Sequence, residues 1–524
     1  MIKESRNIAA AIAALTLSVA AFAHSKENVA AGASTGSATG QDLYKEFQNP
    51  PKSARPRVWW HWMNGNITKD GIKKDLLWMQ KTGIVGFHNF DAGLETPQIV
   101  DKRLIYMTPE WKDAFKYAIN LADSLDMEMT IASSPGWSET GGPWVKDEDA
   151  MKKLVWRQVE IKGGQPVSLK LPEGFDITGP FMDFTGSFDG VSQVFLRKKF
   201  YRDIAVVGVK LSDKDINLKE LHPVITSSGC DATGEEMLER ITGDSVGDYL
   251  DVKTDKNGKC WIQYEFAEPQ TIKAVVVSEL RKDTNPYVHT KELQYSDDGV
   301  NFKSINLSYQ ATAQRTYAIP ATTAKYFRLS LKDNKGKKDC EFGIAQFALS
   351  TVTRIQLAGD KAGNSFYRLL WMEDTPYSSE AARLEDVVDL TPYVKDGTLT
   401  WNAPEGNWRI FRFGYSLVDK LDPKAITEYF HNYLQTYVEA SGGKLGKGGI
   451  EYLLTDSYEA GAQTWTRNMF EEFKARKGYD LLRWMPALTG MVLNNTEETE
   501  RFLFDWRRTI GDMISEYHYD LQNE

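Results

Sequence analysis

The structured part of the chain opens with short apolar runs separated by amphipathic stretches. Three of these runs are predicted to form buried strands, at residues 57–62, 84–87 and 127–132. One helix is expected to begin after its cap Thr68, and another at Thr108, which is followed by a proline suited to the first helical turn. Repeated strand–helix units of this kind predict a parallel α/β sheet or barrel.

The pattern changes between about Val155 and Trp401, where alternating strands and turn signals replace most of the helix. The segments WIQYEF, LQYSDDGVNF and YFRLSL lie in this region. They resemble the discoidin, or factor 5/8 type C, family of jelly-roll domains. Many domains of that family bind sugars and many are structural, and the resemblance leaves both roles open for this chain.

The α/β pattern then resumes. Residues 409–414 and 451–455 are predicted as a fourth and a fifth barrel strand, and helices are expected at 424–438, 466–476 and 497–519. The predicted fold class is therefore α/β plus β. We expect a (β/α)8-type barrel interrupted by inserted β-sandwich or jelly-roll domains. About five βα units are recognisable, so we expect the barrel to be incomplete within this chain.

These patterns predict an order of segments along the chain. They are a signal peptide (1–23), a flexible leader (24–54), the first part of the barrel (55–155), a β-rich insertion (156–221), a discoidin-like β-sandwich (222–350), a β-rich return segment (351–404) and the continuing barrel (405–524). Lys3 and Arg6 precede an apolar run, and Ala21 and Ala23 match a small-residue cleavage pattern. We therefore expect a periplasmic or secreted protein, cleaved near Ala23.

Composition narrows the classes of partner. The formal net charge of −9 argues against general binding to nucleic acid or anionic membranes. No segment after the signal-like run is apolar enough to predict stable membrane insertion. Cys230, Cys260 and Cys340 are widely spaced, so we interpret them as core residues or as one optional disulfide with a free thiol left over.

The strongest chemical signal follows the apolar run 452–454. Asp456, Tyr458 and Glu459 come directly after that predicted strand. Catalytic groups of β/α barrels project from the carboxyl ends of the strands. A carboxyl group placed beside an aromatic ring can have its pKa raised by desolvation and act as a general acid, as glycoside hydrolysis requires. The structural alternative is an acidic loop that caps the next helix.

Four longer motifs stand in the α/β segments: RVWWHWMNGNITKDGI, GFHNFDAG, SSPGWSETGGPWV and LTDSYEAGAQTWT. In sequence and in order they resemble glycoside hydrolase family 106, the α-L-rhamnosidases. The resemblance implies an exported, inverting hydrolase that removes terminal L-rhamnose and uses calcium at its sugar site. It assigns Glu459 as the general acid. Asp456 supports the acid by raising its pKa, orients it, or binds metal or sugar. The resemblance places the catalytic base on a later strand, so we expect it beyond Glu524.

Other predicted strand ends supply candidate sugar ligands, with an ordinary structural hydrogen bond as the alternative for each. These candidates are His61, Trp62, Asn64, His88, Asn89, Asp91, Trp137, Glu139, Asp419, Lys420 and Tyr458. Calcium prefers oxygen ligands, so Asp91 and Glu139 are the candidates for a metal, ahead of the histidines. No EF-hand, P-loop, dinucleotide-binding or HExxH motif occurs.

The resemblance thus implies an exo-α-L-rhamnosidase, or a catalytically incomplete fragment of one, whose partner is a rhamnose-containing oligosaccharide or polysaccharide. Two alternatives remain open. One is a barrel glycosidase for another sugar. The other is a non-catalytic secreted carbohydrate-binding protein whose β-domain does the binding.

Overall fold

The first ordered elements precede the parallel sheet. The computed structural model describes residues 40–93, 96–134, 136, 141, 144–175, 200–244, 249–281, 289–307, 314–333, 341–364, 373–456, 458 and 462–524. The predicted signal peptide lies outside these residues. Helix α2 (Gly40–Gln48) and the 3-10 turn η2 (Lys52–Ala54) fall within the predicted flexible leader and correct that prediction. Leu43, Tyr44 and Phe47 follow a helical apolar spacing, although all three are exposed.

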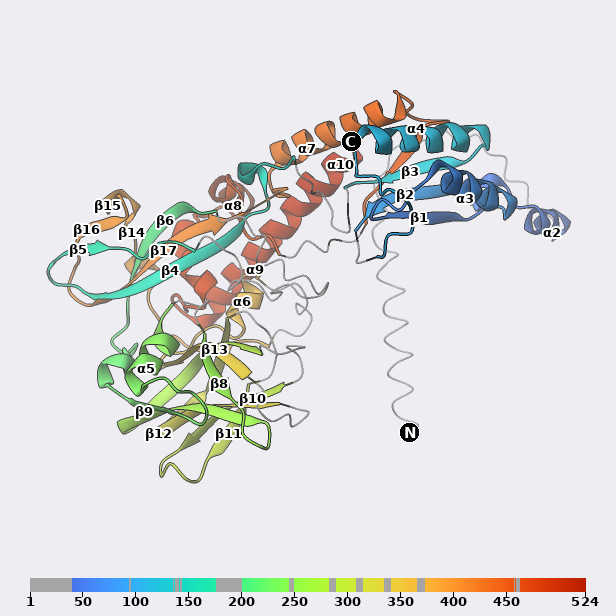
Figure 1. The fold of residues 1–524 in the computed structure, drawn as a ribbon. Helices are drawn as coiled ribbons and strands as arrows, with labels where there is room; N and C mark the ends of the chain where they lie inside the picture. Colours follow the sequence, from blue (N-terminus) through green and yellow to red (C-terminus); the bar gives the residue numbers. More distant parts are fainter. Residues whose placement is uncertain are drawn as a thin grey trace.

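A four-stranded parallel sheet carries the first motifs, and α-helices cover one of its faces (Figure 1). The strand order is β1-β2-β3-β18, with β1 (Arg57–Met63), β2 (Gly86–Ala92), β3 (Glu128–Ala132) and β18 (Ile450–Leu454). The covering helices are α3 (Lys69–Lys81), α4 (Pro109–Ser124) and α7 (Pro423–Ser441). The predicted N-caps are confirmed, since the Thr68 hydroxyl accepts from Gly71 N at 3.0 Å and that of Thr108 from Trp111 N at 3.4 Å.

Strand alternation sorts the aromatic residues of β1 between the two faces of this sheet. Trp60 and Trp62 are buried in the core beneath the helices, where the ring of Trp62 lies 5.6 Å from that of Trp111. Trp59 and His61 lie on the opposite face, which we call the open face. Trp59 is 48% exposed there, and Tyr452 of β18 is 52% exposed. Among the described residues, no helix packs over these two side chains.

The predicted fourth barrel strand is wrong. Residues 409–414 belong to β17 (Asn407–Ser416), which pairs antiparallel with two strands of a separate sheet. The fourth parallel strand is instead β18, so the described residues hold four such strands and not five. The error has a physical cause. Both faces of β17 are buried, Phe411 and Phe413 in one core and Trp408 and Ile410 in another. Its apolar run therefore resembles that of a central parallel strand.

The sheet that contains β17 is wholly antiparallel. Its order is β14-β6-β17-β4, with β4 (Lys153–Lys162), β6 (Arg202–Lys210) and β14 (Val387–Asp389). A small three-stranded sheet adjoins it, formed by β5 (Pro166–Lys170), β15 (Val394–Lys395) and β16 (Thr398–Asn402). Short 3-10 turns lie nearby: η3 (Asp147–Asp149), η8 (Leu384–Asp386) and η9 (Thr391–Tyr393).

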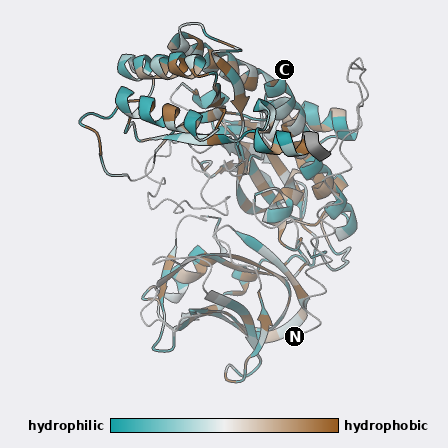
Figure 2. Ribbon diagram, turned by 90° about the vertical axis from the view of Figure 1, so that its right-hand side faces the viewer, coloured by the Kyte–Doolittle hydropathy of each residue, from teal (hydrophilic) through white to brown (hydrophobic). Residues whose placement is uncertain are grey.

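The segments that resemble the discoidin family form one seven-stranded antiparallel sheet, and Figure 2 shows its strands curving around a common interior. Its strands are β7 (Val224–Ser227), β8 (Leu250–Lys253), β9 (Lys259–Arg281), β10 (His289–Ser296), β11 (Lys303–Asn306), β12 (Arg315–Asp333) and β13 (Glu341–Ser350). We call this unit the seven-stranded domain; η6 (Leu218–Leu221) and α5 (Gly234–Thr242) accompany it. Cys260 is buried in its core and Cys230 packs at its edge. Cys340 lies outside the described residues, so the optional disulfide stays a prediction.

Helices near the C-terminus share a core with the antiparallel sheet. They are α6 (Ala358–Lys361), α8 (Met469–Lys477), η10 (Leu482–Thr489), α9 (Thr496–Met513) and the π-helical η11 (Ile514–Asp520). The short helix α10 (Leu521–Asn523) packs instead against the core of the parallel sheet through Leu521. In Figure 1, α9 runs from α10 beside the parallel sheet to α6 near the seven-stranded domain. The predicted terminator Gly478 is confirmed in the left-handed conformation at φ +81°. Within the described residues, none of the helices has the length and apolarity needed to cross a membrane.

Candidate active site

The parallel sheet brings several predicted residues to one edge. Because all four strands run in the same direction, their carboxyl ends meet. His61 and His88 lie inside β1 and β2, rather than after them as the sequence pattern predicted. Asp456 follows β18. The charge of its carboxylate raises the pKa of the His88 ring, and His61 lowers it. His61 and Asp456 thus both lie close enough to His88 for their charges to act on its ring, and we call these three residues the coupled group.

His88 is the most buried member of this group. Its side chain is 4% exposed, and its two ring nitrogens have no hydrogen-bond partner among the described residues. Burial lowers the pKa of His88 from 6.5 to about 4, helped by His61 and opposed by Asp456. The imidazole is therefore neutral at ordinary working pH, with one donor and one acceptor nitrogen.

Truncation of His88 should weaken catalysis uniformly across pH. We expect His88→Ala to lower kcat/KM on the substrate by roughly tenfold, the cost of about one lost hydrogen bond. Because the pKa of His88 is about 4, this loss should be constant from about pH 5 to 8. Steady-state kinetics at several pH values measure it. His431→Ala, on the exposed side of α7, is the control and should leave kcat/KM unchanged. A loss that appears only below pH 6.5 would contradict a neutral His88.

Three other candidates from the same strands lie on the helix side of the sheet. Trp62 packs against Trp111 and Phe115, and Asn89 is 1% exposed with its amide unpaired among the described residues. Asp91 accepts a 2.7 Å hydrogen bond from the Trp111 indole. Burial raises the pKa of Asp91 to about 6, against the effect of that bond. Trp62 and Asp91 are thus held in the core, and we do not include them among the proposed sugar ligands.

Asn64 ends β1 in a tight turn. It has φ +51°, and the next residue, Gly65, has φ +66°. A Cβ on Gly65 would come within 2.0 Å of Leu104 O, so only glycine fits there. The Asn64 amide donates to Thr96 Oγ1 at 2.7 Å. Asn64 therefore shapes the loop after β1.

The predicted acid Glu459 lies outside the described residues, as do Trp137 and Glu139. The neighbour Tyr458 is described, and the Lys420 ammonium lies 5.4 Å from the centre of its ring. Lys420 is only 1% exposed. A cation held against an aromatic ring in a desolvated place is a favourable contact. Lys420 and Tyr458, predicted separately, are thus brought together beside the acid-bearing segment.

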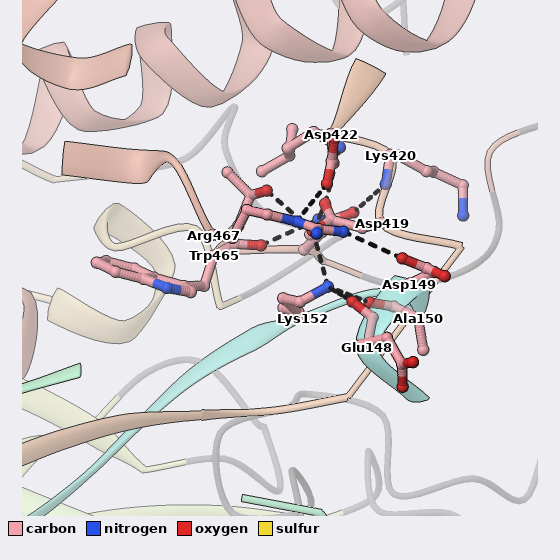
Figure 3. A network of polar contacts seen from close by, with 12 residues as sticks. Glu148, Asp149, Ala150, Lys152, Asp419, Lys420, Asp422, Trp465 and Arg467 are labelled. Atoms are coloured by element: carbon pink, nitrogen blue, oxygen red, sulfur yellow. Dashed lines mark hydrogen bonds and ion pairs between the residues drawn. The ribbon is translucent and has the colours of Figure 1, made fainter. Parts of the chain in front are cut away.

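Asp419 lies at the centre of a buried polar network (Figure 3). Its carboxylate accepts from Lys152 Nζ at 2.9 Å, from Thr466 Oγ1 at 2.9 Å, from Leu421 N at 3.1 Å and from the Gln463 amide. Burial raises the pKa of Asp419, although Lys152, Thr466 and Gln463 oppose the rise. With no exposed surface and both oxygens bonded, Asp419 also leaves our set of sugar ligands. Helix α8 starts at Met469 and not at the predicted Thr466, whose hydroxyl is a member of this network.

The described residues do not supply a calcium site. Among them, no three acidic, histidine or cysteine side chains cluster closely enough to hold a metal ion. Asp91 is a poor ligand because its raised pKa disfavours the ionised form and Trp111 occupies one oxygen. The other candidate, Glu139, is not described. We therefore assign no catalytic step to calcium at the described residues.

Several residues that shape this site were not predicted from the sequence. Trp59 shares the open face with His61, which strict alternation in RVWWHWM could have revealed. Tyr433 and Tyr429 of α7 donate to Ala132 O at 2.7 Å and Ser133 O at 3.2 Å, and so fasten the carboxyl end of β3. Their spacing of four residues was a detectable signal. Lys152 and Gln463 carried no signal, because the partner that they share, Asp419, is distant from both in sequence.

Comparison with known proteins gives a consistent picture. The family model described as alpha-L-rhamnosidase, glycoside hydrolase family 106, matches residues 48–524. A solved rhamnosidase from Novosphingobium sp. PP1Y superimposes with a TM-score of 0.76 and 36% identity, over 91% of this chain and 45% of that one. A putative beta-glucuronidase from Formosa agariphila is 25% identical over 510 residues, 92% of this chain and 30% of the relative.

The chain therefore spans less than half the length of either relative. The family match nevertheless covers both segments of the parallel sheet, the antiparallel sheets and the seven-stranded domain. It also covers His61, His88 and Asp456, the coupled group. The chain belongs to glycoside hydrolase family 106, the alpha-L-rhamnosidase family.

Proposed function

We propose that the protein is an exported exo-α-L-rhamnosidase that removes terminal L-rhamnose from glycans with inversion. The parallel sheet is part of a (β/α)8 barrel, and the open face lines its interior. The coupled group of His61, His88 and Asp456 at the carboxyl edge of that sheet carries the proposal. It supplies hydrogen-bonding groups of the kind that a hydroxyl-rich ring needs, directly before the segment that holds Glu459.

Glu459 is the general acid in this proposal. It delivers a proton to the glycosidic oxygen as the bond to the leaving group breaks. Water attacks the anomeric carbon from the opposite face and gives its proton to a second carboxylate, which the family resemblance places on a later strand. Asp456, three residues earlier, adds a negative charge that keeps the acid protonated. The neutral His88 and the nearby His61 bind sugar hydroxyls. Trp59, half exposed on the same face, offers an aromatic surface for the C–H side of the ring.

A panel of aryl glycosides tests the substrate. The aryl α-L-rhamnoside should be hydrolysed faster than aryl α-L-fucoside, β-glucoside or β-glucuronide. The glucuronide is included because the Formosa relative carries that name. NMR of the first-formed product should show inverted anomeric configuration. Preference for another glycoside would replace rhamnose, and binding of sugars without hydrolysis of any member would favour a carbohydrate-binding protein.

Export is part of the proposal and rests on the basic and apolar residues 1–23. N-terminal sequencing of the protein from the periplasm or medium of an expressing host should find a start near His24. An unprocessed N-terminus in the cytoplasm would contradict it.

Calcium is retained in the proposal on the basis of the family resemblance and of Glu139. Stripping the protein with EDTA should lower rhamnoside hydrolysis or rhamnose binding, and calcium should restore it better than zinc, because a hard cation suits oxygen ligands. Metal analysis of the stripped sample is the control. Full activity in a sample shown to be metal-free would remove calcium.

A further inference from the structure

Three chain segments meet at the buried carboxylate of Asp419. The first, residues 148–152, leads into β4 and so into the β-rich part of the chain. The second, residues 419–422, follows β17 and leads to α7. The third, residues 463–467, lies between β18 and α8. Figure 3 shows side chains from all three converging on this carboxylate.

Each polar group at the centre of this network is used. Lys152 Nζ donates to Glu148 O at 2.7 Å, to Ala150 O at 3.0 Å and to Asp419 at 2.9 Å. The Gln463 amide donates to Asp419 and to Trp465 O at 3.0 Å, while its oxygen accepts from Lys420 N at 2.9 Å. A fully satisfied buried network of this kind is rigid and specifies one arrangement.

The backbone after the acid-bearing segment is fixed by the same residues. Thr464 N and Trp465 N both donate to Lys152 O at 3.2 Å, and Thr464 Oγ1 accepts from Leu154 N at 2.9 Å. Before the segment, Leu454 O accepts from Ser133 N at 3.0 Å at the end of β18. Residues 455–461, which include Glu459, therefore join two anchored points only a short distance apart along the chain.

Lys420 links this anchor to the residues beside Glu459. The backbone N–H of Lys420 donates to the Gln463 side chain, and in Figure 3 the Lys420 side chain points away from the Asp419 network. Its ammonium lies over the ring of Tyr458, the residue that precedes Glu459. A shift of Asp419 or Gln463 would thus be transmitted to both Tyr458 and the backbone at 462–465.

The geometry points to Asp419 and Gln463 as positioning residues that hold the segment flanking Glu459 in its productive place. This inference rests on the proposed function, and it gives Asp419 a role other than sugar binding. The buried pair of Asp419 and Lys152 also joins the root of the inserted β-rich part to the catalytic segment. Misplacing a reacting group by about 1 Å can cost about 100-fold in rate.

The variant Asp419→Asn tests it. This change keeps the shape of the side chain but replaces one accepting oxygen by a donor, which faces Lys152, Thr466 or Gln463. We expect kcat for a rhamnoside with a poor leaving group to fall about 100-fold, with KM nearly unchanged. An activated aryl rhamnoside should lose about tenfold less, because it needs little protonation from a displaced acid.

A matched control separates positioning from stability. The pair of Lys291 and Glu279 in the seven-stranded domain is equally buried, with 2.8 Å between charged atoms against 2.9 Å for Lys152 and Asp419. Glu279→Gln should lower stability but leave the ratio of rates on the two rhamnosides unchanged. If Asp419→Asn does not fold, Thr466→Val removes one donor to Asp419 and should change the ratio in the same direction by less.

Hydrogen–deuterium exchange keeps this inference distinct from the proposed function. Peptides covering 452–466 should exchange faster in Asp419→Asn and remain unchanged in Glu279→Gln. A folded Asp419→Asn variant with wild-type exchange there, or with an unchanged ratio of rates, overturns the positioning role. Absence of any rhamnosidase activity in the full-length wild-type protein overturns the proposed function instead, and exchange then decides the anchoring alone.

Discussion

Glu459→Gln should abolish most hydrolysis of natural rhamnosides while leaving the protein folded. Glutamine keeps the size of the side chain but has no proton to give to the glycosidic oxygen. General acid catalysis contributes roughly 10²- to 10⁴-fold, so kcat on a substrate with an alkyl or sugar leaving group should fall by that amount. A dinitrophenyl rhamnoside, whose leaving group departs without protonation, should lose far less. Steady-state kinetics on the two substrates measure the contrast.

The control is Glu471→Gln, an exposed carboxylate in the first turn of α8. It should change neither rate. Circular dichroism and thermal unfolding should show both variants folded. Equal losses on the two substrates would mean that Glu459 binds or orients the sugar and does not protonate the leaving group. Wild-type rates on both would remove it from the mechanism.

Lys152→Met should strongly destabilise the folded protein. Methionine fills the space but leaves the Asp419 carboxylate buried without its cation. Removing one partner of a buried ion pair typically costs about 3–5 kcal/mol at neutral pH. Lys152 and Asp419 qualify, since their side chains are 2% and 0% exposed. Denaturant unfolding of wild type and variant at pH 7 measures the loss.

The loss should shrink at acid pH. Burial already raises the folded pKa of Asp419, and Lys152 opposes that rise, so its removal raises the pKa further. A carboxyl group with a raised folded pKa binds more protons in the folded state than in the unfolded chain. The ionised carboxylate therefore does not destabilise the folded protein below the unfolded-state pKa. Above that pKa the destabilisation grows until the pH reaches the folded-state pKa. A smaller difference in unfolding free energy at pH 5 than at pH 7 is expected.

Arg412→Met provides the comparison for burial. Arg412 pairs with Asp203 at 2.7 Å on the antiparallel sheet, but the Asp203 side chain is 56% exposed. Water can solvate the carboxylate that remains, so the loss should be below about 1 kcal/mol. Equal losses in the two variants, or a Lys152→Met loss that is independent of pH, would show that Asp419 is not charged in the folded protein.

Local sequence signals located the elements of the parallel sheet well. The N-caps Thr68 and Thr108 and the terminator Gly478 depend on contacts within one or two turns, so their sequence context is sufficient. Pairing could not be obtained in this way. Residues 409–414 carry apolar side chains on both faces, a pattern that fits a parallel or an antiparallel strand, and only the hydrogen bonds to β4 and β6 decide between the two.

The same difference between local signals and long-range contacts applies to the candidate site. Residue types and alternation were enough to propose His61, His88 and Asp456 as candidates near the strand ends, although His61 and His88 lie inside β1 and β2, and Glu459 stays a prediction. What each side chain does depends on partners remote in sequence. The sequence suggested Asp419 as a sugar ligand, but its carboxylate is bonded to Lys152, 267 residues earlier. In the same way, Asp91 is bonded to the indole of Trp111. Burial and charge pairing arise from the packed chain, and they separate a ligand from a structural ion pair.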